Sequence, residues 1–280
     1  MGPGGASPSG PCHPRGQTIA DQPYRLKTFL IAVVVLAAAV VWTTTGGLRW
    51  PARVAVVFLL TILPAFLAAQ ERHATEIPAE IPRLAIYVSS AVMLWIMAVV
   101  ILLAGLTSGL TPAQLGLQAI PLAGLAGWTG AIAGGGILLL VGTRALRLRE
   151  SPMLMHVLPR NGRERLAFVG VAITAGVAEE LIFRGFLIAA LAAVTGSQWF
   201  AAALSSVLFG FLHNYQRLLG ALRAAVLGFG LALPLLMTGS LLPSIIAHAA
   251  YDIVAGVFLA RWLLVIEEAG TQASQTGTDS

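Results

Sequence analysis

The chain has 280 residues, of which 57% are hydrophobic and only 10% are charged. Soluble domains are usually about a quarter charged, so this composition excludes an ordinary soluble protein and predicts an integral membrane protein in contact with lipid. The net charge of +5 is spread over short segments between apolar runs, which argues against a nucleic-acid partner. Because Cys12 is the only cysteine, an intrachain disulfide and a zinc cluster of thiolates are excluded.

The first part of the chain is predicted to be a disordered tail followed by membrane helices. Residues 1–24 are rich in Gly, Pro and Ser, which favours disorder. The N-terminal transmembrane region, 25–143, then contains four uncharged apolar runs of roughly the length that crosses a hydrocarbon core of about 30 Å. These runs lie at 27–44, 53–69, 84–105 and 122–143.

Two features inside these runs predict local structure. Pro64, in the second run, is expected to produce a kink that a membrane helix tolerates. In the fourth run, Gly127, Gly130 and Gly134 have the three- and four-residue spacing that lets another helix approach closely.

A second region, 144–265, begins with a basic segment. Residues 266–280 are predicted to be a disordered C-terminal tail. The second region contains four more apolar runs, at 166–194, 198–213, 219–238 and 241–264. The predicted fold is therefore all-α, a polytopic bundle of about eight transmembrane helices. Because most arginines fall on the side of the N-terminus, we expect both termini in the cytoplasm and the protein in the plasma membrane of a prokaryote.

The strongest chemical signal lies in the fifth run, where Glu179, Glu180 and Arg184 form the pattern E-E-x-x-x-R. Charged groups are costly to bury in hydrocarbon. Glu180 and Arg184 are four residues apart on one helix face and are expected to pair, whereas Glu179 is turned by about 100° from Glu180. An ion pair with a purely structural role would explain Glu180 and Arg184 but not Glu179. The unpaired carboxylate is therefore a candidate general base.

Two further polar sites follow in the next helices. His213 ends the segment Phe209-Gly210-Phe211-Leu212-His213, and His248 and Asp252 share one face of the last run. Taken alone, His213 is explained by a bond to a backbone carbonyl or by a place at the membrane interface, and the His248–Asp252 pair by a bond that ties down the last helix. Their occurrence together with the acidic pair predicts a polar cavity between the fifth, sixth and eighth runs, open to the cytoplasm.

The motifs of three other kinds of intramembrane protease are absent. A His-Glu-x-x-His metalloprotease is excluded because Asn214 follows His213 and Ala249 follows His248. No Gly-x-Ser-Gly segment of a rhomboid-type serine protease occurs in a run. Asp252 is the only aspartate in any run, which excludes a pair of catalytic aspartates.

The ordered motifs E-E-x-x-x-R, F-x-x-x-H and H-x-x-x-N/D resemble those of the CPBP (Abi) family, which includes the CAAX prenyl endopeptidases of the Ras-converting type. The resemblance covers about residues 115–265, and Leu115-Gly116-Leu117 also looks like a short element of this family. It implies an intramembrane endopeptidase in which Glu179 and His213 activate the attacking water. Glu180 and Arg184 would then support the site.

By the same resemblance, His248 and Asp252 would face the oxyanion. The last position is often Asn in the family, so Asp252 is a departure from the usual pattern. Two histidines and a glutamate can also bind zinc, with Glu179, His213 and His248 as the ligands if a metal is present. Since water activated by a glutamate needs no metal, we favour a mechanism without one.

The expected substrate is a peptide or a membrane-anchored protein, with a CAAX-type protein suggested by the eukaryotic members of the family. Two other functions remain open from the sequence. A catalytically silent CPBP-type scaffold or immunity protein would keep the fold without needing Glu179 and both histidines together. A proton-coupled transporter would use the same Glu and His as a proton relay, but its typical pair of broken helices is not evident in the sequence.

Overall fold

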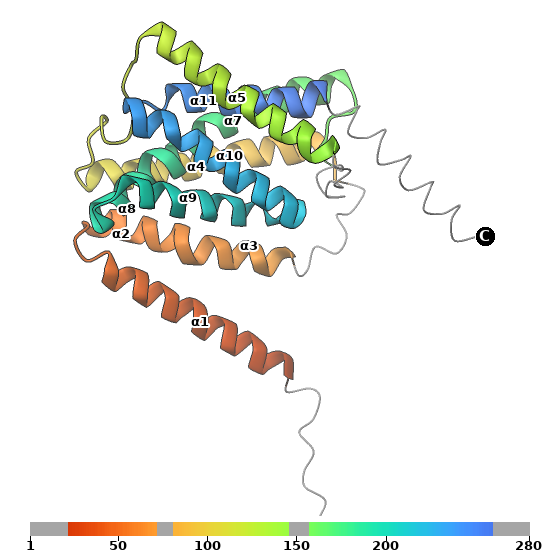
Figure 1. Cartoon of the computed structure of the whole chain (residues 1–280). Coiled ribbons are helices and arrows are strands. Elements are labelled where there is room, and N and C mark those ends of the chain that lie inside the picture. Colours follow the sequence, from red (N-terminus) through yellow and green to blue (C-terminus); the bar gives the residue numbers. More distant parts are fainter. Residues whose placement is uncertain (1–21, 72–80, 146–156, 260–280) are drawn as a thin grey trace, which may run out of the picture.

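In the computed structural model, the described residues are 22–71, 81–145 and 157–259, and they fold into a bundle of helices without any strand (Figure 1). Five helical segments in these ranges are long and apolar enough to cross a membrane, and three shorter apolar helices accompany them. The predicted all-α polytopic bundle is therefore confirmed. The predicted tail 266–280 and most of the tail 1–24 lie outside the described residues.

Among the described residues, the N-terminal half contains four long helical segments: α1, the continuous helix of α2, η2 and α3, then α4 and α5. Its elements are α1 (Gln22–Thr44), α2 (Trp50–Val57), η2 (Phe58–Ile62), α3 (Leu63–Glu71), α4 (Arg83–Thr107) and α5 (Leu122–Ala145). The continuous helix of α2, η2 and α3 contains a π-helical turn at η2, which ends two residues before Pro64. A proline ring crowds the carbonyl four residues earlier, here that of Leu60, and the wide turn makes room for it.

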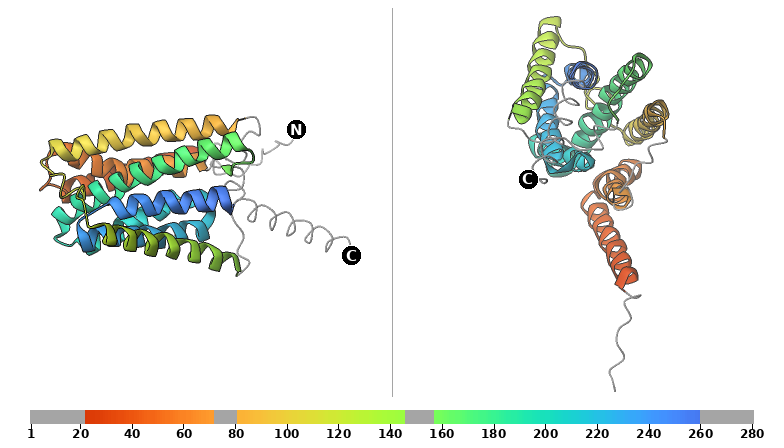
Figure 2. Two further views of the ribbon diagram at one scale, coloured as in Figure 1. Left: turned by 90° about the horizontal axis from the view of Figure 1, so that it is seen from above. Right: turned by 90° about the vertical axis from the view of Figure 1, so that its right-hand side faces the viewer.

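α1 stands at the edge of the bundle, and it packs mainly against α2 and η2 (Figure 2). Of the other N-terminal helices, α4 and α5 pack against helices of the C-terminal half. Its elements are α7 (Gly162–Glu179), η3 (Glu180–Leu187), α8 (Ile188–Thr195), α9 (Gln198–Leu212), η4 (Asn214–Gln216), α10 (Arg217–Thr238), α11 (Leu242–Ile253) and η5 (Val254–Phe258).

α7, η3 and α8 form one continuous rod of 34 residues. It begins with a variant of the capping box: Oδ1 of the N-cap Asn161 accepts from the Glu164 amide at 3.0 Å, and Glu164 Oε2 accepts at 2.7 Å from the amide of Arg160, the residue before the N-cap. It ends at Gly196, whose φ of 72° is the left-handed conformation that stops helices. These local signals fix the span that carries the two adjacent glutamates.

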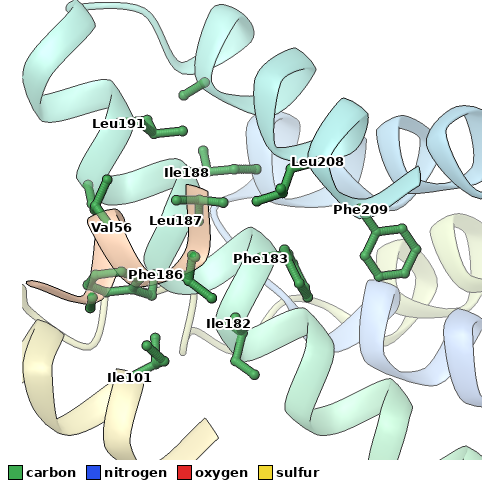
Figure 3. Packing of buried hydrophobic residues seen from close by; sticks show 14 of the residues in the cluster. Val56, Ile101, Ile182, Phe183, Phe186, Leu187, Ile188, Leu191, Leu208 and Phe209 are labelled. Atoms are coloured by element: carbon green, nitrogen blue, oxygen red, sulfur yellow. The ribbon is translucent and has the colours of Figure 1, made fainter. Parts of the chain in front are cut away.

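η3 lies at the centre of the core and is buried at every position except Leu181. Figure 3 shows its apolar side chains, among them Ile182 and Phe186, packed between Val56 of α2, Ile101 of α4 and the side chains of α9. η3 is π-helical, and the Phe183 carbonyl accepts a hydrogen bond from Ser205 Oγ of α9 at 2.8 Å. The irregular turn is thus held by a neighbouring helix.

The segment with Leu115 and Gly116 packs against the end of η3 farther from Glu179. Leu115 is fully buried, and a Cβ at Gly185 would lie 3.1 Å from its carbonyl oxygen. Gly116, with a φ of 75°, accepts from the Leu241 amide at 2.9 Å. The connection before α5 therefore links η3 to the start of α11.

Two glycines bring helix backbones into contact beside the predicted site residues. A Cβ at Gly176 in α7 would lie 2.9 Å from both Ala249 Cβ and the Ile245 carbonyl of α11. A Cβ at Gly210 in α9 would lie 2.6 Å from the Ala221 carbonyl of α10. Gly176 comes one turn before Glu179 and Gly210 one turn before His213, so both polar residues lie next to a close helix crossing.

The prediction that Gly127, Gly130 and Gly134 mediate close helix packing is wrong within the described part of the chain. All three are exposed, and nothing lies within 4 Å of a Cβ built on them. Gly136 takes that role instead, because its Cβ would lie 2.9 Å from the Tyr251 ring of α11. The spacing of small residues shows that they share one face of a helix, but it does not show whether that face points toward the other helices.

Gly210→Ala is expected to lower the thermal unfolding temperature of the detergent-solubilised protein. The added Cβ would lie 2.6 Å from a main-chain oxygen, and overpacking of this kind typically costs about 1–3 kcal/mol. The matched control is Gly127→Ala, where the space is open and alanine improves helix propensity by up to about 1 kcal/mol. Equal unfolding temperatures for the two variants would contradict the α9–α10 contact.

Candidate active site

A buried carboxylate joins two basic side chains at the centre of the site. Glu180 is fully buried, and its Oε1 accepts from Arg184 Nη1 at 3.0 Å and from His248 Nδ1 at 2.8 Å. Arg184 Nη2 donates to the Gly228 carbonyl at 3.1 Å. The predicted pair of Glu180 and Arg184 is confirmed, and it is part of a network that also ties η3 to α10 and α11.

The other ring nitrogen of His248 faces two more carboxylates. Its Nε2 lies 3.8 Å from Glu179 Oε2 and 3.6 Å from Asp252 Oδ2. These distances are those of ion pairs rather than hydrogen bonds. Because an unprotonated nitrogen and two carboxylates would repel one another, at least one proton must lie on this side of the cluster, on the imidazole or on a carboxyl group.

Exposure divides the cluster into a closed side and an open side. The side chains of Glu180 and Arg184 are 0% and 1% exposed, whereas those of Glu179 and Asp252 keep 16% and 29% of their surface accessible. Glu179 and Asp252 are therefore the two acids that an incoming molecule can reach. The adjacent glutamates thus have different environments, as their positions on the helix predicted.

His213 is the residue that follows α9, and it is half-buried. Its Nδ1 lies 2.8 Å from the Phe209 carbonyl, so Nδ1 carries the proton and Nε2 is left as an acceptor. Among the described residues, Glu179 has its polar contact with His248, and His213 has its polar contact with the Phe209 carbonyl. The structure therefore does not join Glu179 to His213 directly.

The turn after α9 lies next to the open side of the site. The Tyr215 ring lies 5.8 Å from that of His213, and Tyr215 is within electrostatic range of Glu179 and Asp252. α9 has 15 residues and rises about 22 Å, less than the hydrocarbon thickness of about 30 Å. If α9 starts at one membrane face, this turn lies within the thickness of the bilayer.

Phe209 and Gly228 contribute to the site but were not predicted as site residues. The Arg184 guanidinium carbon lies 4.3 Å from the centre of the Phe209 ring. A Cβ at Gly228 would lie 2.9 Å from Arg184 Nη2, so only glycine leaves room there for the guanidinium. Phe209 is the first residue of the F-x-x-x-H pattern, which was a signal in the sequence, whereas Gly228 is one of many glycines in apolar runs.

The three candidate zinc ligands do not gather into a metal site. In the described ranges of the chain, no group of three or more His, Cys, Asp or Glu is placed to hold a metal ion. Nδ1 of His213 is taken by a backbone carbonyl, and Nδ1 of His248 by Glu180. These bonds leave Nε2 of each histidine as the nitrogen that could face a metal, and no step proposed below passes through one.

Fold and site together define a polytopic helical membrane protein with a buried Glu/Arg/His/Asp cluster that is accessible on one side. Residues 161–254 match a family model, Rce1-like, described as "Type II CAAX prenyl endopeptidase Rce1-like". The match covers about a third of the chain and spans all six predicted site residues, which supports the resemblance of its motifs to the CPBP/CAAX protease family. Comparison with curated proteins and with solved structures gives no match.

Arg184→Ala is expected to destabilise the protein strongly, since it leaves the fully buried Glu180 without its guanidinium partner. Breaking a buried pair on one side typically costs about 3–5 kcal/mol, to be measured as a lower thermal unfolding temperature in detergent. The double variant Glu180→Gln/Arg184→Ala removes the stranded charge and should recover part of the loss. Wild-type stability of Arg184→Ala would rule out the structural role of the network.

Proposed function

We propose that the protein is an intramembrane endopeptidase of the CAAX prenyl endopeptidase type, in which Glu179 activates a water molecule. The observation that carries this proposal is the asymmetry of the glutamate pair. Glu180 is fully buried and hydrogen-bonded to Arg184 and His248, whereas Glu179 keeps 16% of its side chain accessible and lies 3.8 Å from His248. A carboxylate in that position has the access that a general base needs.

In the proposed reaction, Glu179 takes a proton from water while the water oxygen attacks the carbonyl carbon of the scissile peptide bond. The unprotonated Nε2 of His213 orients this water by accepting its second hydrogen, and its open acceptor supports that role. The carbonyl becomes a tetrahedral oxyanion. Glu179 then returns the proton to the leaving nitrogen, and the C–N bond breaks.

His248 and Asp252 are proposed to stabilise the oxyanion. A proton on His248 Nε2 or on Asp252 would provide a donor on the open side of the cluster, and Glu180 anchors the imidazole through Nδ1 at 2.8 Å. An ionised Asp252 close to an oxyanion would repel it, so Asp252 acts here as a neutral donor. Preorganised donors of this kind account for much of the rate enhancement in acyl transfer.

The substrate proposed is a peptide segment that reaches the site from the membrane, such as the C-terminal segment of a membrane-anchored CAAX-type protein. The description of the matching family supports this class of substrate. We also propose that the protein lies in the plasma membrane of a prokaryote with both termini in the cytoplasm, because most of the arginines in its connecting segments fall on one side.

Glu179→Gln is expected to reduce peptide cleavage by about 10² or more, since the amide cannot accept the water proton. The measurement uses protein in proteoliposomes with a fluorogenic farnesylated peptide that ends in a CAAX sequence. Folding should be unchanged, because Glu179 is outside the hydrogen bonds of the buried network, and thermal unfolding serves as the control. A variant that cleaves at the wild-type rate would refute the role of Glu179.

Asp252→Asn is expected to keep most of the activity, since the amide preserves a donor of the same shape at this position. Asp252→Ala removes the donor and should cost about 10² in kcat, as the loss of an oxyanion donor does. The two rates are compared in the same cleavage assay. If Asp252→Asn is as slow as Asp252→Ala, Asp252 acts as the counter-ion of His248 instead.

A further inference from the structure

One aromatic ring touches three of the six polar site residues. Phe209 of α9 is 3% exposed, and its ring centre lies 4.3 Å from the Arg184 guanidinium carbon. The ring centres of His213 and His248 lie 4.4 Å and 6.0 Å away. The Phe209 ring therefore contacts one side chain of η3, one of α11 and the residue that follows α9.

The contact with Arg184 has the geometry of a cation–π interaction. The face of an aromatic ring carries negative potential and attracts a cation within about 6 Å of its centre, more strongly where water is excluded. Hydrogen bonds to Glu180 and to the Gly228 carbonyl hold the edge of the guanidinium, and the Phe209 ring covers one of its faces. Gly228 makes this possible, because a Cβ there would lie 2.9 Å from Nη2 and 3.3 Å from Phe209 Cδ1.

Phe209 acts on both histidines by different routes. Its ring fixes Arg184, which holds Glu180 Oε1, which in turn holds His248 Nδ1 and so aims Nε2 at the open side. Its carbonyl accepts from Nδ1 of His213 and so fixes the tautomer with a free Nε2. The side chain of Phe209 thus bears on His248, and its main chain bears on His213.

We propose that Phe209 is a positioning residue, which sets the orientation of His248 through a cation–π contact with Arg184. This inference rests on the proposed function for its consequence in catalysis, but the contact and its effect on the histidine can be measured without any substrate. Phe209 touches no reacting atom in this scheme: its ring acts on His248 through Arg184 and Glu180, and its carbonyl holds Nδ1 of His213.

Phe183 provides a matched control within the same core. It is also 3% exposed, and its ring packs edge-on against Phe209 with centres 5.3 Å apart (Figure 3). Phe183 belongs to η3 and packs in the apolar cluster. A change at Phe183 therefore alters aromatic packing at the same depth while leaving the Arg184–Phe209 contact in place.

The test replaces each ring in turn by phenylalanines with one, two and three fluorine atoms, which weaken the negative potential of the ring face while nearly preserving its shape. At position 209, kcat for the farnesylated CAAX peptide should fall stepwise by about tenfold across the series, with little change in KM. At position 183, the same series should leave kcat within about twofold. Equal slopes at the two positions, or a flat series at 209, would overturn the proposal.

A second measurement needs no cleavage. In protein with ¹⁵N-labelled histidine, the Nδ1 resonance of His248, assigned with His248→Gln, reports the hydrogen bond to Glu180 far more than the ring current of Phe209 6.0 Å away. It should move progressively with fluorination at 209 and stay fixed with fluorination at 183. If the wild-type protein cleaves nothing but this resonance moves as expected, the proposed function fails and the positioning role stands. A resonance that does not respond at 209 would reject the positioning role whatever the activity.

Discussion

The structure depends on how a carboxylate and a guanidinium are kept inside an apolar helix bundle. Glu180 and Arg184 are among the largest fully buried side chains of the described residues, and isolated charges at that depth would be prohibitively costly. The cost is offset by hydrogen bonds from three elements, because Glu180 binds Arg184 and His248 while Arg184 binds the Gly228 carbonyl. The positions of η3, α10 and α11 follow from these bonds, and so does the direction in which the reactive side of His248 points.

Around this network, small residues bring the helices close enough for short polar side chains to meet. Gly176 and Gly210 allow α7 to touch α11 and α9 to touch α10, and Ser244 Oγ donates to the Leu231 carbonyl at 2.7 Å to join α11 to α10. In a membrane, where lipid removes the hydrophobic driving force between helices, such close packing and interhelical hydrogen bonds hold a bundle together. The small residues therefore bring the helices close enough for the polar cluster to form, and the hydrogen bonds of the cluster hold the same helices together.

Periodicity was enough to predict some of this arrangement but not all of it. The number of apolar helices and the Glu180–Arg184 pair followed from run length and from four-residue spacing, which are properties of a single helix. The bond from His248 to Glu180 was not predicted, because spacing gives the face of a helix but neither its neighbour nor the rotation of a ring. The same limit explains why Gly136 rather than Gly134 meets α11, and why the contact of Phe209 with Arg184 was not foreseen.

The four-residue spacing of Glu180 and Arg184 also bears on how the chain enters the membrane. Both residues lie in the span that is synthesised before α10 and α11, so Gly228 and His248 do not yet exist as partners when this span leaves the ribosome. Since the two charges lie on one face of the same helix, they can neutralise each other at once, which lowers the cost of inserting a segment with a buried ion pair. The other two partners follow in order of synthesis, Gly228 with α10 and then His248 with α11.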